Sequence, residues 1–233
     1  MEKPRFATLQ RVRTEERTFA ITPRIPGGFV TPEILNRLAE VAKKYHATLK
    51  ITSGQRIMLL GLKESDVNRA WDELGMEPAV VSPYSVKNIE ICPASFCKRS
   101  KQNSMKLGLK LEKRFYAAPA PNRTKIGVAG CLNACTSANA RDISVLADEN
   151  GYIVVAGGSA GYHPRLPDRI AEGLDEDQAF LMVEAVFEYY AANAEMGEKL
   201  GPWIDKIGLE AFKTGVLQLY AEKTQQKETQ PHE

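Results

Sequence analysis

Two short segments hold every cysteine of this chain: EICPASFCKRS at residues 90–100 and GVAGCLNACTSAN at residues 127–139. Apolar stretches typical of strands lead into both of them, KNIEIC at 87–92 and TKIGVAG at 124–130. Polar or basic residues follow each cysteine pair. A chain that gathers its thiols in this way is expected to use them together, in metal binding or in redox chemistry.

The cysteine spacings narrow the choice of metal. Cys131 and Cys135 are four positions apart, so both thiolates can face one metal from a single helical turn or a tight loop. Four residues separate Cys92 from Cys97. By number, four thiolates suit zinc and an iron–sulfur cluster equally well. Structural zinc favours tight C-x2-C knuckles, whereas these spacings are looser and their surroundings are basic. The residues favour a cluster, with zinc and unligated buried cysteines as the alternatives.

Length and composition exclude several classes of protein. The chain has 233 residues, of which 43% are hydrophobic, enough for one large domain or two small ones. Its first residues, MEKPRFATLQRVRTEER, are charged throughout, so no signal peptide is expected. No apolar run approaches the roughly 18 residues of a membrane span, and the cysteines are too few for a disulfide-dense secreted scaffold. A cytoplasmic protein without a membrane partner is expected.

The net charge of +2 hides an uneven distribution. From Lys98 to Lys125, nine Lys or Arg residues accompany a single acid, Glu112. From Asp142 to the end, seven basic residues face seventeen acids. An anionic ligand is therefore expected near the middle third of the chain. No aromatic-interleaved motif accompanies these charges, so nucleic acid is not the expected partner.

Residues 1–83 are predicted to form a small α+β unit. The expected elements are a strand at 17–23, a helix at 31–46, two strands within 48–61 and a helix at 64–75. Thr31 is the predicted N-cap of the first helix, Pro32 its first residue and Gly75 the stop of the second. The order of these elements is half of a split βαβ plan, which predicts a ferredoxin-like half-domain.

Residues 84–220 are predicted to form a second, mixed α/β domain after a proline-containing linker. The expected elements are strands at 87–92, 124–130, 142–147 and 152–158, a basic helix from Lys98 to about Ala118, and closing helices at 175–195 and 202–220. The polar tail at 221–233 has no core-forming residues and is expected to be disordered. The expected fold class is thus α+β, a half-domain followed by a mixed α/β domain.

The chain resembles the sirohaem-containing sulfite and nitrite reductases. Their hallmark is two cysteine pairs, the second inside a GC-x-N-x-C loop, which Gly130, Cys131, Asn133 and Cys135 match here. The resemblance runs from Ile25 to about Gly215, through GGFVTPEILNRLAEVAKKYHATLKITSGQRIMLLG, PNRTKIGVAGCLNAC, ARDISVLA and IVVAGGSAG. One departure is the first pair, usually C-x5-C in the family, which is C-x4-C in CPASFC.

The resemblance implies two cofactors, sirohaem and a 4Fe-4S cluster. It assigns Cys92, Cys97, Cys131 and Cys135 to the cluster, and makes Cys135 the thiolate that also bridges to the sirohaem iron. A shared thiolate gives electrons a short path between the two metal centres. The basic residues of the middle third would neutralise a macrocycle that bears eight carboxylates. The residues expected to reach those carboxylates are Thr52, Gln55, Arg99, Lys101 and Asn133.

The resemblance also implies a site for a small anionic substrate, formed by Arg56, Lys87, Arg123 and Lys125. Arginine offers a forked donor that never deprotonates, whereas the pKa of a lysine falls when other cations crowd it, so that it can pass on a proton. Six-electron reduction of sulfite to sulfide is the expected reaction. Nitrite reduction to ammonia is the alternative, because TSGQR resembles the bacterial nitrite reductase large subunit. A non-catalytic 4Fe-4S electron-transfer protein is the competing class.

Three further expectations concern partners. No G-x-G-x-x-G motif opens a helix after a strand, so a separate ferredoxin or flavoprotein is expected to supply the electrons. His163 and Arg165 follow a glycine-rich turn and are weaker candidates for anion contacts. Larger members of the family contain two copies of this module, so two chains could pair around a twofold axis as a homodimer.

Overall fold

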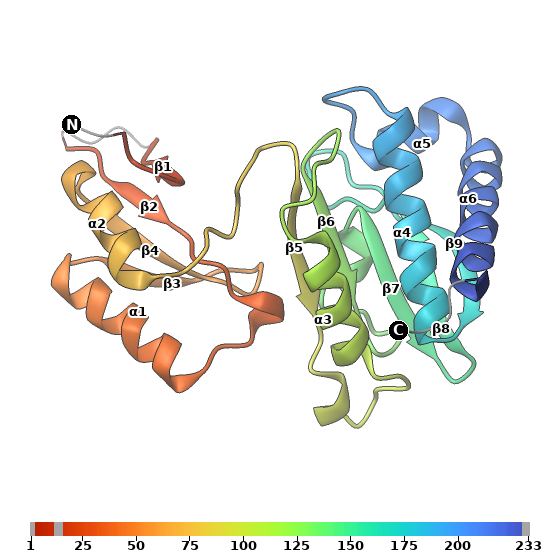
Figure 1. The fold of residues 1–233 in the computed structure, drawn as a ribbon, viewed down its shortest axis with the longest axis horizontal. Coiled ribbons are helices and arrows are strands. Elements are labelled where there is room, and N and C mark those ends of the chain that lie inside the picture. The colour runs from red at the N-terminus through yellow and green to blue at the C-terminus, as the bar shows by residue number, and fades with distance from the viewer. Residues whose placement is uncertain (1–2, 12–15, 230–233) are drawn as a thin grey trace. The chain divides into compact units, whose positions relative to one another are not determined.

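The computed structural model describes residues 3–11 and 16–229, and the chain divides into two compact units after Val81 (Figure 1). The described elements of the amino-terminal unit are β1 (Ala7–Leu9), β2 (Phe19–Ile21), the 3-10 turn η1 (Pro26–Gly28), α1 (Pro32–Lys44), β3 (Thr48–Ile51), β4 (Ile57–Leu62) and α2 (Glu64–Leu74). The strands form an antiparallel sheet in the order β1-β2-β4-β3.

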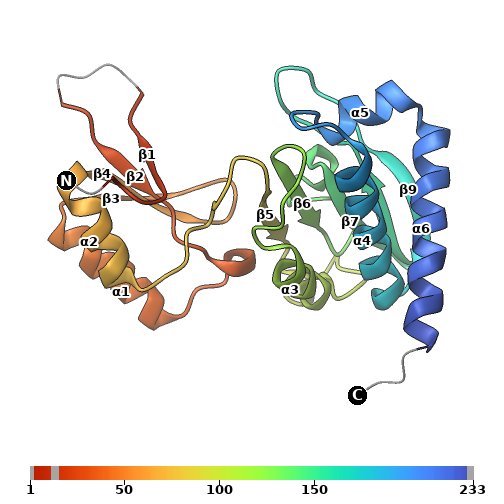
Figure 2. The same cartoon turned by 45° about the horizontal axis from the view of Figure 1, so that its top comes forward.

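Local signals place both helices of this unit. The Thr31 side chain accepts a hydrogen bond from the backbone N–H of Ile34, and Pro32 opens α1, as predicted. Gly75 ends α2 in the left-handed conformation with φ of 57°. The helices pack together with the sheet (Figure 2), and Leu38, Leu59 and Trp71 are among the residues of their shared core. The short strand β1 has no counterpart in the prediction.

The carboxy-terminal unit is built on a five-stranded sheet. Its described elements are β5 (Val86–Ile91), η2 (Ala94–Phe96), α3 (Ser104–Phe115), β6 (Thr124–Val128), η3 (Ala138–Ala140), β7 (Ile143–Asp148), β8 (Gly151–Ala156), β9 (Asp168–Leu174), α4 (Glu176–Asn193), α5 (Leu200–Ile207) and α6 (Leu209–Thr229). The strand order is β5-β6-β7-β8-β9. The first three strands are parallel, and β8 and β9 add antiparallel pairs.

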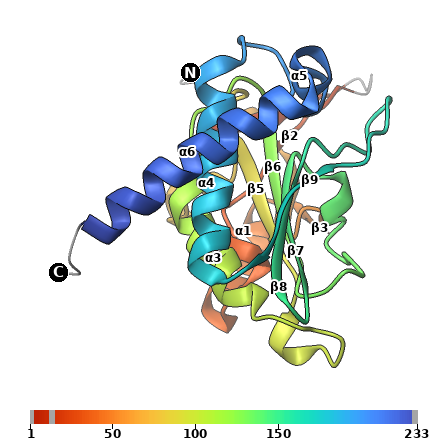
Figure 3. The ribbon, with the colours of Figure 1, turned by 90° about the vertical axis from the view of Figure 1, so that its right-hand side faces the viewer.

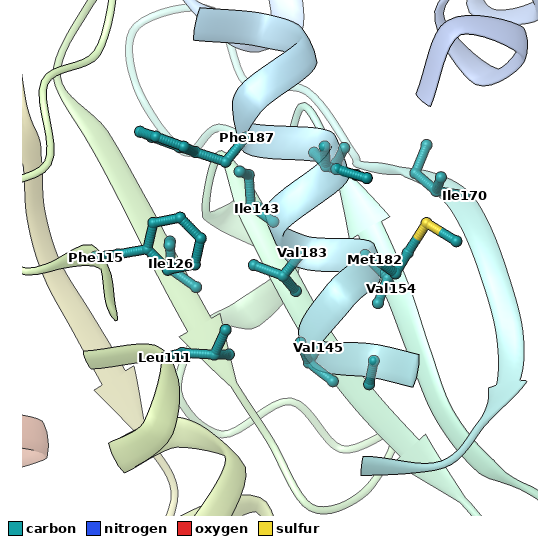
Figure 4. Packing of buried hydrophobic residues seen from close by; sticks show 14 of the residues in the cluster. Leu111, Phe115, Ile126, Ile143, Val145, Val154, Ile170, Met182, Val183 and Phe187 are labelled. Carbon is teal, nitrogen blue, oxygen red and sulfur yellow. The ribbon is translucent and has the colours of Figure 1, made fainter. Parts of the chain in front are cut away.

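One face of this sheet carries the main core. Ile126, Ile143 and Val145 point toward α3 and α4 (Figure 4), where the rings of Phe115 and Phe187 meet edge to face at a centroid distance of 4.9 Å. Helix α6 lies on the same side of the sheet as α4 (Figure 3), and its buried Phe212 and Val216 belong to the same core. Burial of these apolar side chains holds the helices on the sheet.

The opposite face of β5 and β6 is polar. Side chains alternate between the faces of a strand, so Asn88 and Glu90 lie on the face turned away from Ile89 and Ile91. The register pairs Asn88 with Lys125 and Glu90 with Gly127, which places Lys125 on the same polar face. Along β5 and β6 the sheet therefore has one face for packing and one face that carries charge, whereas Leu146, Ile153 and Val155 of β7 and β8 form a second, smaller apolar cluster.

Two predicted helices differ from the observed ones. The basic helix expected from Lys98 begins only at Ser104, because the side chain of Asn103 caps it by accepting a hydrogen bond from the backbone N–H of Lys106. The helix expected at 202–220 is two helices, α5 and α6, which Gly208 separates with a φ of 88°. The charged, glycine-containing strand β9 also has no counterpart in the prediction.

The tail expected to be disordered at 221–233 instead continues α6 as far as Thr229, and residues 230–233 lie outside the described part of the chain. Ion pairs with α4 account for this, since Lys223 pairs with Glu188 at 2.7 Å and Lys227 pairs with Asp177 at 2.8 Å. Asp177 also accepts from Lys110, and together these two lysines lower the pKa of Asp177 to about 2. The tail is thus ordered by long-range charge pairing that local composition does not reveal.

Among the described residues, no helix is both long enough and apolar enough to cross a membrane.

Candidate functional site

Parallel pairing of β5 with β6 brings the two cysteine segments to one edge of the sheet. Cys92 directly follows β5, and Gly130 and Cys131 follow β6 after a single alanine. The backbone N–H of Cys92 donates to the carbonyl of Val128 at 3.0 Å, which continues the ladder into the first segment. Since the carboxyl ends of parallel strands share an edge, residues 38 positions apart become neighbours.

The thiol of Cys92 is buried among hydrogen-bonding groups. The backbone N–H of Gly130 donates to its Sγ at 3.2 Å, and the N–H of Ala94 donates at 3.4 Å. The Ser104 hydroxyl lies 3.2 Å from the same sulfur. Amide donors of this kind stabilise negative charge on a sulfur ligand, as they do around cluster-bound thiolates. The surroundings of Cys92 therefore fit a thiolate ligand of an iron–sulfur cluster.

Gly130 is a second point of contact between the two segments. Its carbonyl accepts from the backbone N–H of Lys101 at 2.7 Å and from the Ser100 hydroxyl at 3.3 Å. A Cβ at this position would lie 2.2 Å from Ser100 Oγ and 3.0 Å from the carbonyl oxygen of Gln102. Only glycine fits without movement of the neighbouring segment. Gly130 thus couples the loop after Cys97 to the GC-x-N-x-C loop.

The other three thiols are more open than that of Cys92. Cys97 and Cys135 are exposed and Cys131 is half-buried. Asn133 donates from Nδ2 to Cys135 Sγ at 3.0 Å, so the tight turn orients this sulfur. Within the described ranges, no three His, Cys, Asp or Glu side chains are close enough to hold a metal ion. The fold brings the two segments together, and the ligand role of each cysteine stays a prediction.

Lys125 is a half-buried cation on the polar face of β6. Burial lowers the pKa of its amine, and the positive charges of Arg141 and Arg123 lower it further. The negative charges of Glu90 and Asp142 act in the opposite direction. Arg123 itself is exposed immediately before the strand. An amine in these surroundings releases a proton more readily than an ordinary lysine.

Three charged residues that the sequence reasoning missed surround this position. Glu90 lies on β5, buried, and forms an ion pair of 2.5 Å with Nη2 of Arg141. The Asp142 carboxylate accepts a hydrogen bond of 2.8 Å from the backbone N–H of Lys125. Burial raises the pKa of this carboxyl group. A signal for Glu90 was present, because an acid inside an apolar strand needs a partner. No local pattern pointed to Arg141 as that partner.

The remaining sequence-predicted residues lie in two places. Thr52, Gln55 and Arg56 share the β3–β4 loop of the amino-terminal unit, where the backbone N–H of Thr52 donates to the Arg56 carbonyl at 2.9 Å. Gln55, not Gly54, takes the left-handed conformation there, with φ of 58°. This loop thus holds three predicted contact residues in a single tight turn.

The other predicted residues belong to the carboxy-terminal unit. Arg99 is exposed, and Lys101 pairs with Glu149 at 2.7 Å, which raises the pKa of its amine. Lys87 donates from Nζ to the carbonyl of Ser82 at 2.5 Å. Arg165 pairs with Asp205 and Asp168 and donates to the carbonyl of Gly157, so its guanidinium anchors its own loop. His163 is exposed beside Tyr162, with ring centroids 4.7 Å apart.

We expect Gly130→Ala to lower the free energy of unfolding by about 1–3 kcal/mol, the usual cost of overpacking a filled site. The added methyl group must displace Ser100 or the Gln102 carbonyl. Gly161→Ala is the matched control, because the nearest atom to its new Cβ is 3.5 Å away. Urea unfolding measures both variants, and equal stability of the two would contradict the tight contact.

Comparison with known proteins identifies the family to which the two units are related. Residues 84–224 match the domain family described as nitrite and sulphite reductase 4Fe-4S domain, and residues 11–77 match the nitrite/sulfite reductase ferredoxin-like half domain. The chain is 32% identical over 218 residues to an assimilatory-type sulfite reductase of Nitratidesulfovibrio vulgaris, covering 93% of this chain and 99% of that protein. It is 30% identical to an NAD(P)H nitrite reductase of Emericella nidulans, covering 86% of this chain but 19% of that protein.

Solved structures show the same fold. A dissimilatory sulfite reductase I matches 86% of this chain and 69% of its own, with a TM-score of 0.74 at 14% identity. The NirA protein of Mycobacterium tuberculosis matches 88% of this chain and 40% of its own, with a TM-score of 0.72 at 16% identity. The predicted fold class, a ferredoxin-like half-domain with a mixed α/β domain, is confirmed. The domain matches and the full-length relative together show that this chain belongs to the sirohaem nitrite and sulfite reductase family.

Proposed function

We propose that this chain reduces sulfite to sulfide, HSO3− + 6 e− + 6 H+ → HS− + 3 H2O, with sirohaem and a 4Fe-4S cluster. The observation that carries the proposal is the junction of β5 and β6, where both cysteine segments meet at the end of a face that holds a desolvated lysine. The likeness to an assimilatory-type sulfite reductase over 99% of that protein supports the choice of substrate.

Four cysteines would hold the cluster: Cys92, Cys97, Cys131 and Cys135. When bound, the cluster would supply electrons and the sirohaem would supply the redox centre for the substrate. By resemblance, Cys135 would be a ligand common to both groups, and Asn133 donates a hydrogen bond to its sulfur. Thr52, Gln55, Arg99, Lys101 and Asn133 are proposed to bind carboxylates of the macrocycle.

The proposed substrate site uses cations of different kinds. Arg56 and Arg123 would bind the anion through fixed guanidinium donors, and Lys87 would add a compact charge. Lys125 would also donate protons, because burial lowers the pKa of its amine and the amine therefore gives up a proton more readily than a solvated one. Each oxygen that leaves as water needs two protons, so a repeatedly reprotonated donor suits this reaction.

Nitrite reduction to ammonia is the second candidate, because the chain is 30% identical to NAD(P)H nitrite reductases of Emericella nidulans and Bacillus subtilis. Both are much longer proteins, of which the chain spans about a fifth to a quarter. A separate ferredoxin or flavoprotein is proposed as the electron donor. The cytoplasm is the proposed location, since a reducing compartment keeps four thiols available for ligation.

We expect Cys135→Ser to abolish reduction of sulfite and to change the visible spectrum of the anaerobically purified protein, because the proposed shared ligand is lost. Cys92→Ser is expected to lower cluster content instead. Spectra and steady-state rates with sulfite and with nitrite measure both effects. Full activity with an unchanged spectrum in Cys135→Ser would contradict the ligand assignment, and faster turnover of nitrite by the unaltered protein would favour the second candidate.

We expect Lys125→Ala to lower kcat/KM for sulfite by roughly 10- to 150-fold, since one charge-assisted hydrogen bond contributes about 1.5–3 kcal/mol. Arg56→Ala is expected to lower kcat/KM by a factor in the same range. Cluster absorbance should survive in both variants. Lys106→Ala is the control, because Lys106 is an exposed lysine on α3 that pairs with Glu176. If Lys125→Ala and Arg56→Ala had the same kinetics as Lys106→Ala, neither Lys125 nor Arg56 would take part in the reaction.

We further propose a homodimer in which cations of one subunit face the cysteines of the other. NirA is a chain of which this one covers only 40%, so there is room in it for a second module of this size. Two copies of the present chain could supply the same two sets of residues around a twofold axis.

Mixing the inactive variant Cys135→Ser with the impaired variant Lys125→Ala tests the shared site. Heterodimers should regain one intact site, and therefore more activity than the two unmixed variants contribute, only if the two residues act from different subunits. Mass measurements on differently tagged subunits confirm the exchange. A monomeric mass at working concentration, or exchange without recovered activity, would overturn the shared-site proposal.

A further inference from the structure

The ion pair between Glu90 and Arg141 crosses the polar face of the sheet beside Lys125. Arg141 follows η3, and its Nη2 lies 2.5 Å from Glu90 Oε2 on β5. The Glu90 carboxylate also accepts from Asn88 Nδ2 at 2.8 Å, so one oxygen bonds to each partner. Both charged side chains are nearly buried, at 3% and 12% exposure. The guanidinium is thereby held in one place.

Gly127 makes this crossing possible. A Cβ on Gly127 would lie 3.1 Å from Arg141 Cγ, 3.1 Å from the Cα of Ala138 and 3.3 Å from Ser144 Oγ. The arginine stem therefore lies flat over a residue without a side chain, in the middle strand of the parallel set. Lys125 is two residues before Gly127, on the same face of the same strand. The stem of Arg141 thus lies against Gly127, on the face of β6 that also carries Lys125.

Glu90 does not fully satisfy the guanidinium. Nε of Arg141 is buried and has no hydrogen-bond partner among the described residues. A buried ion pair adds little net stability compared with apolar side chains of the same size, so its main consequence is the field it produces in a poorly solvated region. The charged groups that act on Lys125 are Arg141 and Arg123 on the positive side and Glu90 and Asp142 on the negative side.

We propose that Arg141 is a positioning residue for Lys125. Its ion pair with Glu90 holds it against Gly127, where its fixed positive charge makes the Lys125 amine a better proton donor. Neither Arg141 nor Glu90 belongs to the predicted anion site, and neither needs to touch the substrate. The role rests on the proposed function, because it concerns proton delivery by Lys125. Its electrostatic part is measurable whether or not sulfite is the substrate.

The two partners should act on Lys125 in opposite directions. Arg141→Gln removes a positive charge, which favours the protonated amine, so the titration of Lys125 moves to higher pH. Glu90→Gln removes a negative charge and leaves Arg141 in place, so the titration moves to lower pH. General damage to the site would instead admit water in both variants and move both titrations to higher pH, because desolvation is the largest cause of the present shift.

The test is competitive acetylation of lysines by acetic anhydride in the full-length holoprotein between pH 6 and 11, with the Lys125 peptide quantified by mass spectrometry. Only the unprotonated amine reacts, so the pH profile reports its titration directly. We expect a several-fold lower rate for Lys125 at pH 8 in Arg141→Gln and a higher rate in Glu90→Gln. Exposed Lys106 provides the internal reference in every sample.

Two further variants keep the test decisive if a single substitution prevents folding. Arg141→Lys retains the charge and should keep the profile close to that of the unaltered protein. The double variant Glu90→Gln/Arg141→Gln leaves no buried charge unpaired, and should move the titration to higher pH because the effect of Arg141 is the larger. Titrations that all move in one direction, or that do not move, would overturn the proposal even if the protein reduces sulfite.

The pH dependence of kcat/KM separates this role from a purely structural one. If Lys125 is the proton donor, the basic limb of the profile should follow its titration, to higher pH in Arg141→Gln and to lower pH in Glu90→Gln. Acetylation profiles that shift as expected without a matching shift in kcat/KM would leave the electrostatic coupling intact and remove Lys125 from proton delivery.

Discussion

The parallel pairing of β5 with β6 is the constraint on which the rest of the site depends. It continues past the strands through the hydrogen bond from Cys92 to the Val128 carbonyl, and it ends where the N–H of Gly130 meets Cys92 Sγ. One ladder therefore sets both the distance between the two cysteine segments and the burial of the first thiol. The absence of a side chain at Gly130 is part of the same constraint, because a methyl group there would hold the segments apart.

The two faces of β5 and β6 differ in character. Aliphatic residues of β6 and β7 pack against α3 and α4, and their burial stabilises the unit. The other face keeps charges in poorly solvated surroundings, which is costly unless each charge has a partner. Glu90 and Arg141 are each other's partners in a buried ion pair. For Lys125, burial and the neighbouring arginines outweigh the nearby acids, so the pKa of its amine is lowered.

Local and long-range signals compete along the helices of the second unit. Asn103 and Gly208 override helical composition, since the Asn103 side chain caps the start of α3 and Gly208, with a φ of 88°, interrupts the helix between α5 and α6. At residues 221–229 the balance is reversed, and lysines that would favour a solvated tail are drawn to acids on α4. The family relationship extends over both units.

The sequence by itself determined the cysteine spacing, most of the strands and helices, the cap at Thr31 and the family resemblance, because period, capping and motifs are properties of neighbouring residues. It also placed Lys125 on a strand among apolar residues. Only the tertiary structure decided that Arg141 reaches Glu90, 51 positions away, and that Gly127 leaves room for it. The order of parallel strands creates that contact, and no local pattern encodes the order. Burial, which sets the proton affinity of Lys125, likewise exists only after the sheet has formed.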